Sequence, residues 1–188
     1  IARFPSQLAY RVALGEILAQ DEQYEGAKQV LQQVIAADEN NKDASLALGD
    51  VYFMTDKLDA ALSQYFNAAR VDPADPAPLF RAGELYIKAN KPSDAQKQFQ
   101  LVLRVNPLFP RAHYNLARAQ YLLGIGDLAI KELEEEKKLN PRLADPYEFA
   151  GDIMMAGRKF GNATKEYQKA AELKPPGAGI YVKLAKAY

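Results

Sequence analysis

The chain has 188 residues, with 24 Lys and Arg balanced by 24 Asp and Glu, so its formal net charge at pH 7 is zero. A neutral protein of this kind argues against nucleic acid or an anionic membrane as the main partner, because both attract a net basic surface. Cysteine is absent, which excludes disulfide frameworks, thiolate metal sites and cysteine nucleophiles.

No apolar run approaches the roughly 20 residues that a membrane helix needs, so we expect a soluble chain without membrane insertion. No secretory signal pattern is present near Ile1 either. The sequence leaves the localisation open, with the cytoplasm favoured. The chain stops at Tyr188 inside an apolar-periodic segment, from which we expect a piece of a longer protein.

A period of 34 residues runs through the whole chain without an insertion. One column of the repeat holds only Gly or Ala, and it consists of Gly15, Gly49, Gly83, Ala117, Gly151 and Ala185. A second column is uniformly Ala, at Ala27, Ala61, Ala95, Ala129 and Ala163. A third column is large and mostly aromatic, at Leu31, Tyr65, Phe99, Leu133 and Tyr167.

Within each period the apolar residues recur at helical spacing, which predicts two helices per unit. In the second unit we expect helices over residues 42–55 and 58–70, each followed by a turn. We divide a single domain, residues 1–188, into units 8–41, 42–75, 76–109, 110–143 and 144–177. Residues 178–188 would form the first helix of a sixth unit or a capping helix.

The columns of small and large residues have a packing reason. Two helices approach closely only where the facing residues are small. We therefore expect Gly49 on the first helix to face Ala61 on the second. The large column, with Tyr65 as its member in this unit, would fill the space between neighbouring units.

This pattern resembles the tetratricopeptide repeat family. The residues that carry the resemblance in the second unit are Leu48, Gly49, Tyr52, Ala61, Tyr65 and Pro73. The resemblance extends over residues 8–188 and implies an all-α fold, a right-handed superhelical solenoid of antiparallel helix pairs. It also implies a non-catalytic scaffold or adaptor that binds another protein or a peptide.

The fourth unit departs furthest from the repeat. Gln120 replaces the Tyr found at Tyr52, and Glu136 stands where Ala68 stands in the second unit. Glu136 belongs to a charged run, residues 132–138, for which two interpretations remain open. The run is either a solvated helix face with Glu–Lys pairs, or a local loosening or docking patch on the outer face.

The sequence shows no catalytic constellation, metal cluster or cofactor motif, so we expect no enzyme and no cofactor. The single histidine, His113, occupies a packing column of the family, which indicates a packing role. Gly124 and Gly126 lack the preceding strand and following Lys-Ser/Thr of a phosphate loop, and are typical of a helix-to-helix turn.

The resemblance also implies where a partner would bind, because first helices line the concave side of such solenoids. The candidate partner-binding residues at the inward positions are Phe53, Phe80, Arg81, Glu84, Tyr114, Asn115, Arg118, Tyr121, Phe149 and Asp152. A line of acidic residues through Glu84 would favour a ligand carrying Lys or Arg, whereas arginines such as Arg81 would receive a carboxylate. Part of the aromatic stripe is equally explained by packing between helices.

Two further functions remain open at this stage. The chain is either the targeting or regulatory segment of a larger multidomain protein or enzyme, or a homo-oligomer through its C-terminal helix. The second possibility rests on the apolar residues Tyr181, Leu184 and Tyr188. The subtype that clamps chaperone C-termini is disfavoured, because only Arg81 matches its carboxylate clamp.

Overall fold

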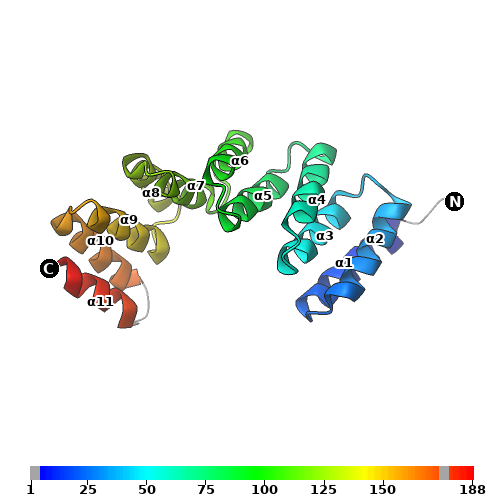
Figure 1. The fold of residues 1–188 in the computed structure, drawn as a ribbon, viewed down its shortest axis with the longest axis horizontal. Helices are drawn as coiled ribbons and strands as arrows, with labels where there is room; N and C mark the ends of the chain where they lie inside the picture. Colours follow the sequence, from blue (N-terminus) through cyan, green and yellow to red (C-terminus); the bar gives the residue numbers. More distant parts are fainter. Residues whose placement is uncertain (1–4, 174–177) are drawn as a thin grey trace. The chain divides into compact units, whose positions relative to one another are not determined.

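The computed structural model describes residues 5–173 and 178–188, and these form helices joined by short turns (Figure 1). Two compact units divide the chain, unit 1 at Ile1–Pro107 and unit 2 at Leu108–Tyr188. The predicted boundary at residue 177 lies outside the described residues. Our division into one domain stays a prediction.

The helices alternate between the first and second helix of each predicted repeat. Unit 1 holds α1 (Pro5–Gln20), α2 (Tyr24–Ala37), α3 (Lys42–Met54), α4 (Leu58–Val71), α5 (Ala77–Lys88) and α6 (Pro92–Val105). Unit 2 holds α7 (Ala112–Leu122), α8 (Gly126–Leu139), α9 (Ala144–Ala156), α10 (Phe160–Leu173) and α11 (Ala178–Ala187). The all-α fold and the helix pairs are as predicted.

Each helix pair is joined by the same turn. The residue in the left-handed region recurs every 34 positions, at Glu22, Asp56, Asn90, Gly124 and Arg158. The amide of the next residue reaches back to a carbonyl five residues earlier, as from Lys57 to Tyr52 and from Ile125 to Gln120, both within 3.0 Å. This pattern ends the first helix and satisfies its terminal carbonyls.

The small and large columns meet inside each helix pair. A Cβ built on Gly49 would lie 2.6 Å from Cε1 of Tyr65, so the aromatic ring occupies the space that any side chain would need. The nearest side chains are Tyr65 and Gln64, rather than the predicted Ala61. Gly83 meets Phe99 and Gly151 meets Tyr167 in the same way.

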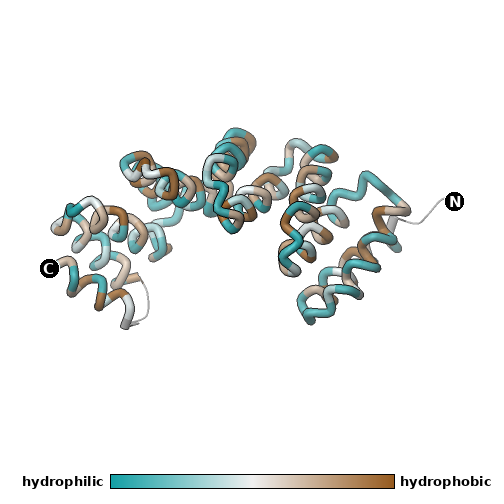
Figure 2. The backbone as a smooth tube through the Cα atoms, viewed as in Figure 1, coloured by the Kyte–Doolittle hydropathy of each residue, from teal (hydrophilic) through white to brown (hydrophobic). Residues whose placement is uncertain are grey.

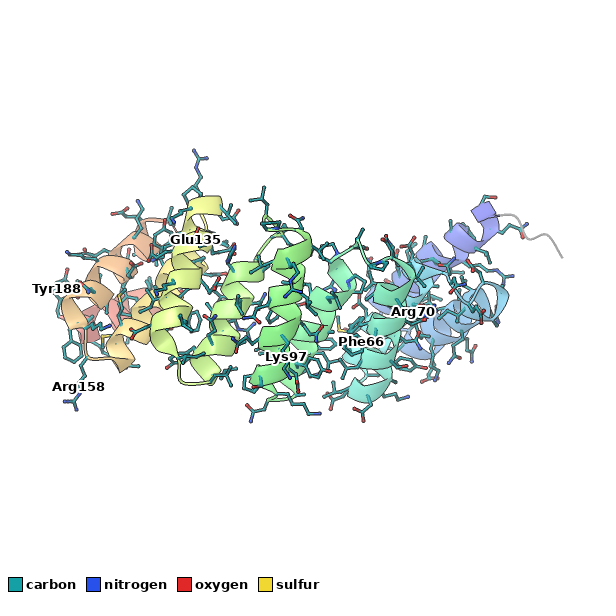
Figure 3. The ribbon with its side chains drawn as sticks, turned by 90° about the horizontal axis from the view of Figure 1, so that it is seen from above. Phe66, Arg70, Lys97, Glu135, Arg158 and Tyr188 are labelled. Atoms are coloured by element: carbon teal, nitrogen blue, oxygen red, sulfur yellow. The ribbon has the colours of Figure 1, made fainter. Side chains whose placement is uncertain are left out.

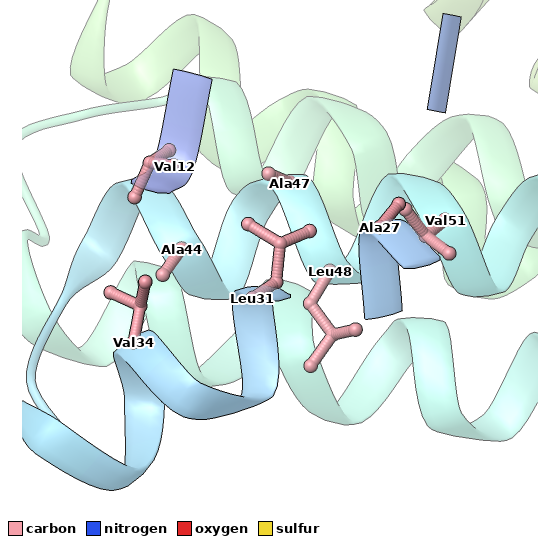
Figure 4. Close-up of a cluster of buried hydrophobic side chains, with 8 residues drawn as sticks. All are labelled: Val12, Ala27, Leu31, Val34, Ala44, Ala47, Leu48 and Val51. Atoms are coloured by element: carbon pink, nitrogen blue, oxygen red, sulfur yellow. The ribbon is translucent and has the colours of Figure 1, made fainter. Parts of the chain in front are cut away.

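Hydrophilic and hydrophobic residues both occur along the helices (Figure 2), and the core of each unit forms where the apolar residues of neighbouring helices meet. One core cluster of unit 1 links α1, α2 and α3 (Figure 4), and its members are Val12, Ala27, Leu31, Val34, Ala44, Ala47, Leu48 and Val51. Tyr65 packs with Ala82 and Leu85 of the following pair, as predicted for the large column. Stacking therefore leaves one side of each first helix available to solvent.

Candidate functional site

All ten predicted partner-binding residues lie on first helices. Phe53 is on α3, while Phe80, Arg81 and Glu84 are on α5. The remaining residues belong to unit 2, and they are Tyr114, Asn115, Arg118 and Tyr121 on α7 and Phe149 and Asp152 on α9. The solvent-facing sides of α1, α3 and α5 together form what we call the unit-1 face.

A polar network crosses the unit-1 face. Asp50 accepts a hydrogen bond from the Tyr65 hydroxyl at 2.8 Å, and its Oδ1 lies 3.6 Å from Nε of Arg81. Nη1 of Arg81 is 3.5 Å from Oε2 of Glu84. Burial and the neighbouring Asp50 carboxylate raise the pKa of Tyr65, so its hydroxyl remains a proton donor. Arg81 is thus already engaged by two carboxylates.

The two predicted aromatic residues of unit 1 make contacts within the unit. The Phe80 ring meets the buried Phe99 ring edge-on, with centroids 5.6 Å apart. The ammonium group of Lys88 lies 4.6 Å from the centroid of Phe53. Both aromatic residues are half-buried, so each combines a packing role with a solvent-accessible edge.

An acidic cavity of about 500 Å3 opens on the unit-1 face. Its lining comes from α1, α3 and α5 and comprises Glu16, Ala19, Gln20, Asp43, Leu46, Ala47, Asp50, Met54 and Arg81. A smaller cavity of about 110 Å3 shares three of these residues and adds Phe53, Tyr65 and Glu84. Sequence reasoning identified the acidic line but missed the cavity.

The corresponding face of unit 2 is closed by an aromatic cluster, which consists of Tyr114, Tyr121 and Phe149. The Phe149 ring meets the Tyr114 ring at 5.8 Å and the Tyr121 ring at 5.5 Å between centroids, both in edge-to-face geometry. Tyr121 remains 38% exposed. The structure therefore brings together three of the predicted residues as a half-exposed apolar surface.

Charged and amide groups border the aromatic cluster. The Arg111 guanidinium lies 4.7 Å from the Tyr114 centroid and reaches Asp145 at 3.4 Å. Arg118 donates to the side chain of Asn115 at 2.9 Å. Asn115 is only 3% exposed, so this predicted contact residue instead orients Arg118 from within the helix packing.

Asp152 has a structural role as well. It accepts hydrogen bonds from the Tyr167 hydroxyl at 2.9 Å and from Lys183 at 2.7 Å, which connects α9 to α10 and α11. Lys183 also lies 2.9 Å from Glu148. Burial and the bond to Asp152 raise the pKa of Tyr167, as Asp50 does for Tyr65 in unit 1.

The charged run of the fourth repeat agrees only in part with the predicted solvated face, because Glu135 and Lys138 are exposed and paired at 2.6 Å whereas two other residues are buried. Glu136 is fully buried, and its Oε2 accepts the backbone amide of Tyr114 at 3.2 Å while Oε1 accepts from Asn140 at 2.8 Å. Lys137 is also buried, 2.7 Å from Glu166 of the next repeat. The prediction of a solvated face is therefore wrong for these two residues.

Glu136 supplies an acceptor that α7 lacks in its own sequence. The residue before the helix, Arg111, adopts a left-handed conformation with φ 61° and provides no side-chain cap. A carboxylate at a helix N-terminus satisfies a free amide and interacts favourably with the helix dipole. The buried Glu136 thus anchors the helix that carries Tyr114.

His113 lies in the helix packing, as its column predicted. Its Nδ1 is 2.7 Å from Oε2 of Glu132 on α8. The hydrogen bond to Glu132 raises the pKa of His113 despite partial burial, and the nearby carboxylates of Glu136 and Glu135 act in the same direction. The imidazole therefore ties α7 to α8.

Sequence reasoning also missed an apolar turn between α7 and α8. Its exposed members are Leu122, Leu123, Ile125 and Leu128. Leu123 and Ile125 stand where the second repeat carries the polar residues Thr55 and Lys57. A cavity of about 230 Å3 lies beside this turn and reaches Ile153 and Lys159. The run Leu-Leu-Gly-Ile in the sequence is the signal that would have indicated it.

Across residues 5–173 and 178–188, no group of three or more His, Asp or Glu side chains is placed to hold a metal ion. Among the same residues, no helix combines the length and apolar character required to cross a bilayer.

Fold and site together define an all-α repeat protein whose first helices carry half-exposed aromatic and acidic surfaces. A model of the tetratricopeptide repeat matches residues 12–78 and 80–144. The chain therefore belongs to the tetratricopeptide repeat family, as the resemblance implied.

Two curated relatives share part of this sequence. The mitochondrial import receptor subunit TOM70 of Rattus norvegicus is 30% identical over 128 residues, which cover 64% of this chain and 21% of the relative. The peroxisomal targeting signal receptor of Saccharomyces cerevisiae is 29% identical over 97 residues, covering 52% of this chain and 16% of the relative. The chain thus spans about a fifth or less of these proteins.

Solved structures share the fold over most of the chain. The Pseudomonas aeruginosa pilF structure has a TM-score of 0.83 at 20% identity and covers 95% of this chain and 83% of its own. The structure of YrrB, described as a TPR protein with an unusual peptide-binding site, has a TM-score of 0.76 at 18% identity and covers 94% and 90%. At these identities the likeness concerns the fold alone.

Proposed function

We propose that this chain is a non-catalytic protein-binding module that holds a peptide or partner protein against its first helices. The aromatic cluster of unit 2 carries the proposal, because half-exposed aromatic residues bordered by arginines are the usual energetic centres of protein interfaces. The relatives support it, since two of them are named as receptors and YrrB is described as having a peptide-binding site.

Each unit would bind through the exposed part of its own face. In unit 1 the edges of Phe53 and Phe80 would contact the partner, with Glu84 matching its charge. In unit 2 the aromatic cluster would supply most of the buried apolar area, and Arg118 would be held in place by Asn115. Asp152 would contribute chiefly through packing, because Tyr167 and Lys183 occupy its carboxylate.

Affinity capture from a lysate of the source organism, read by mass spectrometry, tests this proposal. Wild type is compared with Phe80→Glu/Tyr114→Glu, in which a charge on each face opposes desolvation of the interface. The matched control is Phe66→Glu/Phe160→Glu, with the same change at exposed positions on the second helices α4 and α10 (Figure 3 labels Phe66). We expect a protein that is lost only from the first variant; equal capture by all three would contradict the proposal.

A role as one segment of a larger protein is compatible with this function. The chain matches only 21% of TOM70 and 16% of the yeast receptor, so most of each relative lies outside the matched region. We propose the same binding chemistry in that setting, with the partner brought to whatever the remaining sequence carries. The complete reading frame decides between the two arrangements.

Self-association through α11 is a second candidate function. Tyr181 is 48% exposed and Val182 is 52% exposed, whereas Leu184 packs partly into the core of unit 2. Sedimentation velocity at rising concentration tests this candidate. Dimers that disappear in Tyr181→Glu would support it, and a monomer at every concentration would exclude it.

A further inference from the structure

The acidic cavity of the unit-1 face combines two kinds of wall. Carboxylates come from two helices, with Glu16 on α1 and Asp43 and Asp50 on α3. One guanidinium, that of Arg81, comes from α5. The remaining lining is largely apolar and includes Leu46, Ala47 and Met54. With about 500 Å3 of space, the cavity is large enough for a long side chain with part of its backbone.

The carboxylates of Glu16 and Asp43 are free to pair with a ligand. Within residues 5–173 and 178–188, no hydrogen bond or ion pair joins the Glu16 or Asp43 carboxylate to another group, and both side chains are exposed. Arg81 does not offset them, because it already lies between Asp50 and Glu84. The cavity therefore presents a net negative charge to any ligand.

Ala47 of α3 lines the cavity, and its repeat position differs along the chain. The same position holds Ala13 in α1, Arg81 in α5, Asn115 in α7 and Phe149 in α9, at steps of 34 residues. In unit 2 the Phe149 ring occupies this place among its aromatic neighbours, whereas in α3 the small alanine stands beside the cavity. The cavity therefore depends on residues that differ between repeats.

A cation already lies beside Phe53, a residue that lines the smaller adjoining cavity. The ammonium group of Lys88 is 4.6 Å from the centroid of the Phe53 ring and 2.9 Å from Asp56. A cation between an aromatic face and a carboxylate is a favourable arrangement. In the acidic cavity a partner cation would meet the carboxylates, with aliphatic side chains in place of the aromatic face.

We propose that the acidic cavity binds a lysine or arginine side chain of an extended partner segment. The cationic tip would lie between Glu16 and Asp43, and the methylene chain would lie along Leu46, Ala47 and Met54. Long cationic side chains bind in this way, with an apolar stem against apolar walls and a charged end toward carboxylates. This inference rests on the proposed function and names the chemistry that unit 1 selects.

Defined peptide mixtures test the inference directly. The probes are acetylated hexapeptide amides with one fixed central residue, either Lys, Arg, Gln, norleucine or Glu, and the other five positions randomised. Binding of the full chain is measured by fluorescence anisotropy at low and high salt. We expect the Lys and Arg mixtures to bind at least about tenfold more tightly than norleucine or Gln, and to weaken with salt.

Two variants locate the binding in the acidic cavity. Glu16→Gln/Asp43→Asn removes the available charges, and Ala47→Phe fills the space without changing charge. We expect each to weaken Lys and Arg binding by about tenfold. The control is Asp21→Asn/Glu39→Gln, which makes the same charge change at exposed positions of unit 1 outside the cavity and should bind like wild type.

Three results would overturn the inference: no preference for Lys or Arg, no binding of any mixture, or a preference that survives both cavity variants. Circular dichroism and urea unfolding of each variant exclude loss of fold as the cause of weaker binding. Failure of the proposed function is separate, because it would appear as partner capture that survives Phe80→Glu/Tyr114→Glu.

Discussion

The two units present different surfaces on helices of the same repeat position. Unit 1 has an open acidic cavity above Ala47, whereas unit 2 places Phe149 at the equivalent position between Tyr114 and Tyr121. The supporting contact beneath them is the same, with an aspartate that accepts from the tyrosine hydroxyl of the second helix. The two units thus share one packing scheme but present different surfaces. The residues that differ, Ala47 and Phe149, lie outside the repeated contact between glycine and tyrosine.

The shared packing is where we expect the largest effect. A Cβ at Gly151 would lie 2.5 Å from Cε1 of Tyr167, so Gly151→Val should overpack the pair and lower the free energy of unfolding by roughly 3 kcal/mol. Urea unfolding measures this change. If the units are built alike, Gly49→Val should cost a similar amount.

The control for this variant is Gly161→Ala, where a Cβ meets nothing within 4 Å. It should be neutral or stabilise α10 by up to about 1 kcal/mol. If Gly151→Val is as stable as the wild type, Gly151 and Tyr167 are not in close contact.

The position that distinguishes the units should give the next largest effect. Phe149→Ala removes both edge-to-face contacts and should lower the free energy of unfolding by about 2 kcal/mol, less than for a fully buried ring. The reciprocal Ala47→Phe enlarges a side chain that is only 7% exposed but lines the acidic cavity, so part of the ring should fit into the cavity and the loss should be smaller, about 1 kcal/mol. An equal loss of unfolding free energy in the two variants would contradict the difference between the filled position at Phe149 and the cavity beside Ala47.

The buried Glu136 should give a smaller effect specific to unit 2. Glu136→Ala leaves the Tyr114 amide without its acceptor, which should lower the free energy of unfolding by about 1–2 kcal/mol. Glu136→Gln retains an acceptor oxygen and should lose less. An Ala variant as stable as wild type would mean that the amide finds another partner, and that α7 is anchored elsewhere.

The smallest effect concerns pH. Because the Glu132 carboxylate raises the pKa of His113, protonation of the imidazole stabilises the folded state. That contribution is fully present below the unfolded pKa of about 6.5 and is lost as pH rises through the folded value. In an NMR titration, the pKa of His113 should be higher in the wild type than in the Glu132→Gln variant. The same pKa in both proteins would exclude the pairing of His113 with Glu132.

Sequence reasoning predicted the features that repeat and missed those that depend on single exceptions. The helix pairs, their turns and the packing of Tyr65 follow from a period that every unit obeys. The burial of Glu136 could not be predicted, because a charged run normally marks a solvent-facing side and its partner, the Tyr114 amide, lies on another helix.

The acidic cavity was missed for a similar reason. Its lining comes from residues of three helices, and an empty volume between them leaves no motif in a sequence. The aromatic residues were correctly assigned to first helices, but their contacts with each other could be seen only once α7 and α9 were placed.

Photo-crosslinking in lysate tests the central claim most directly, namely that the first helices bind the partner. Benzoylphenylalanine would replace Tyr121 on α7 or Phe66 on α4, two positions that are both 38% exposed but lie on first and second helices respectively. We predict a crosslinked partner from position 121 and none from position 66. A crosslink from position 66 alone would contradict this account and assign binding to the second helices.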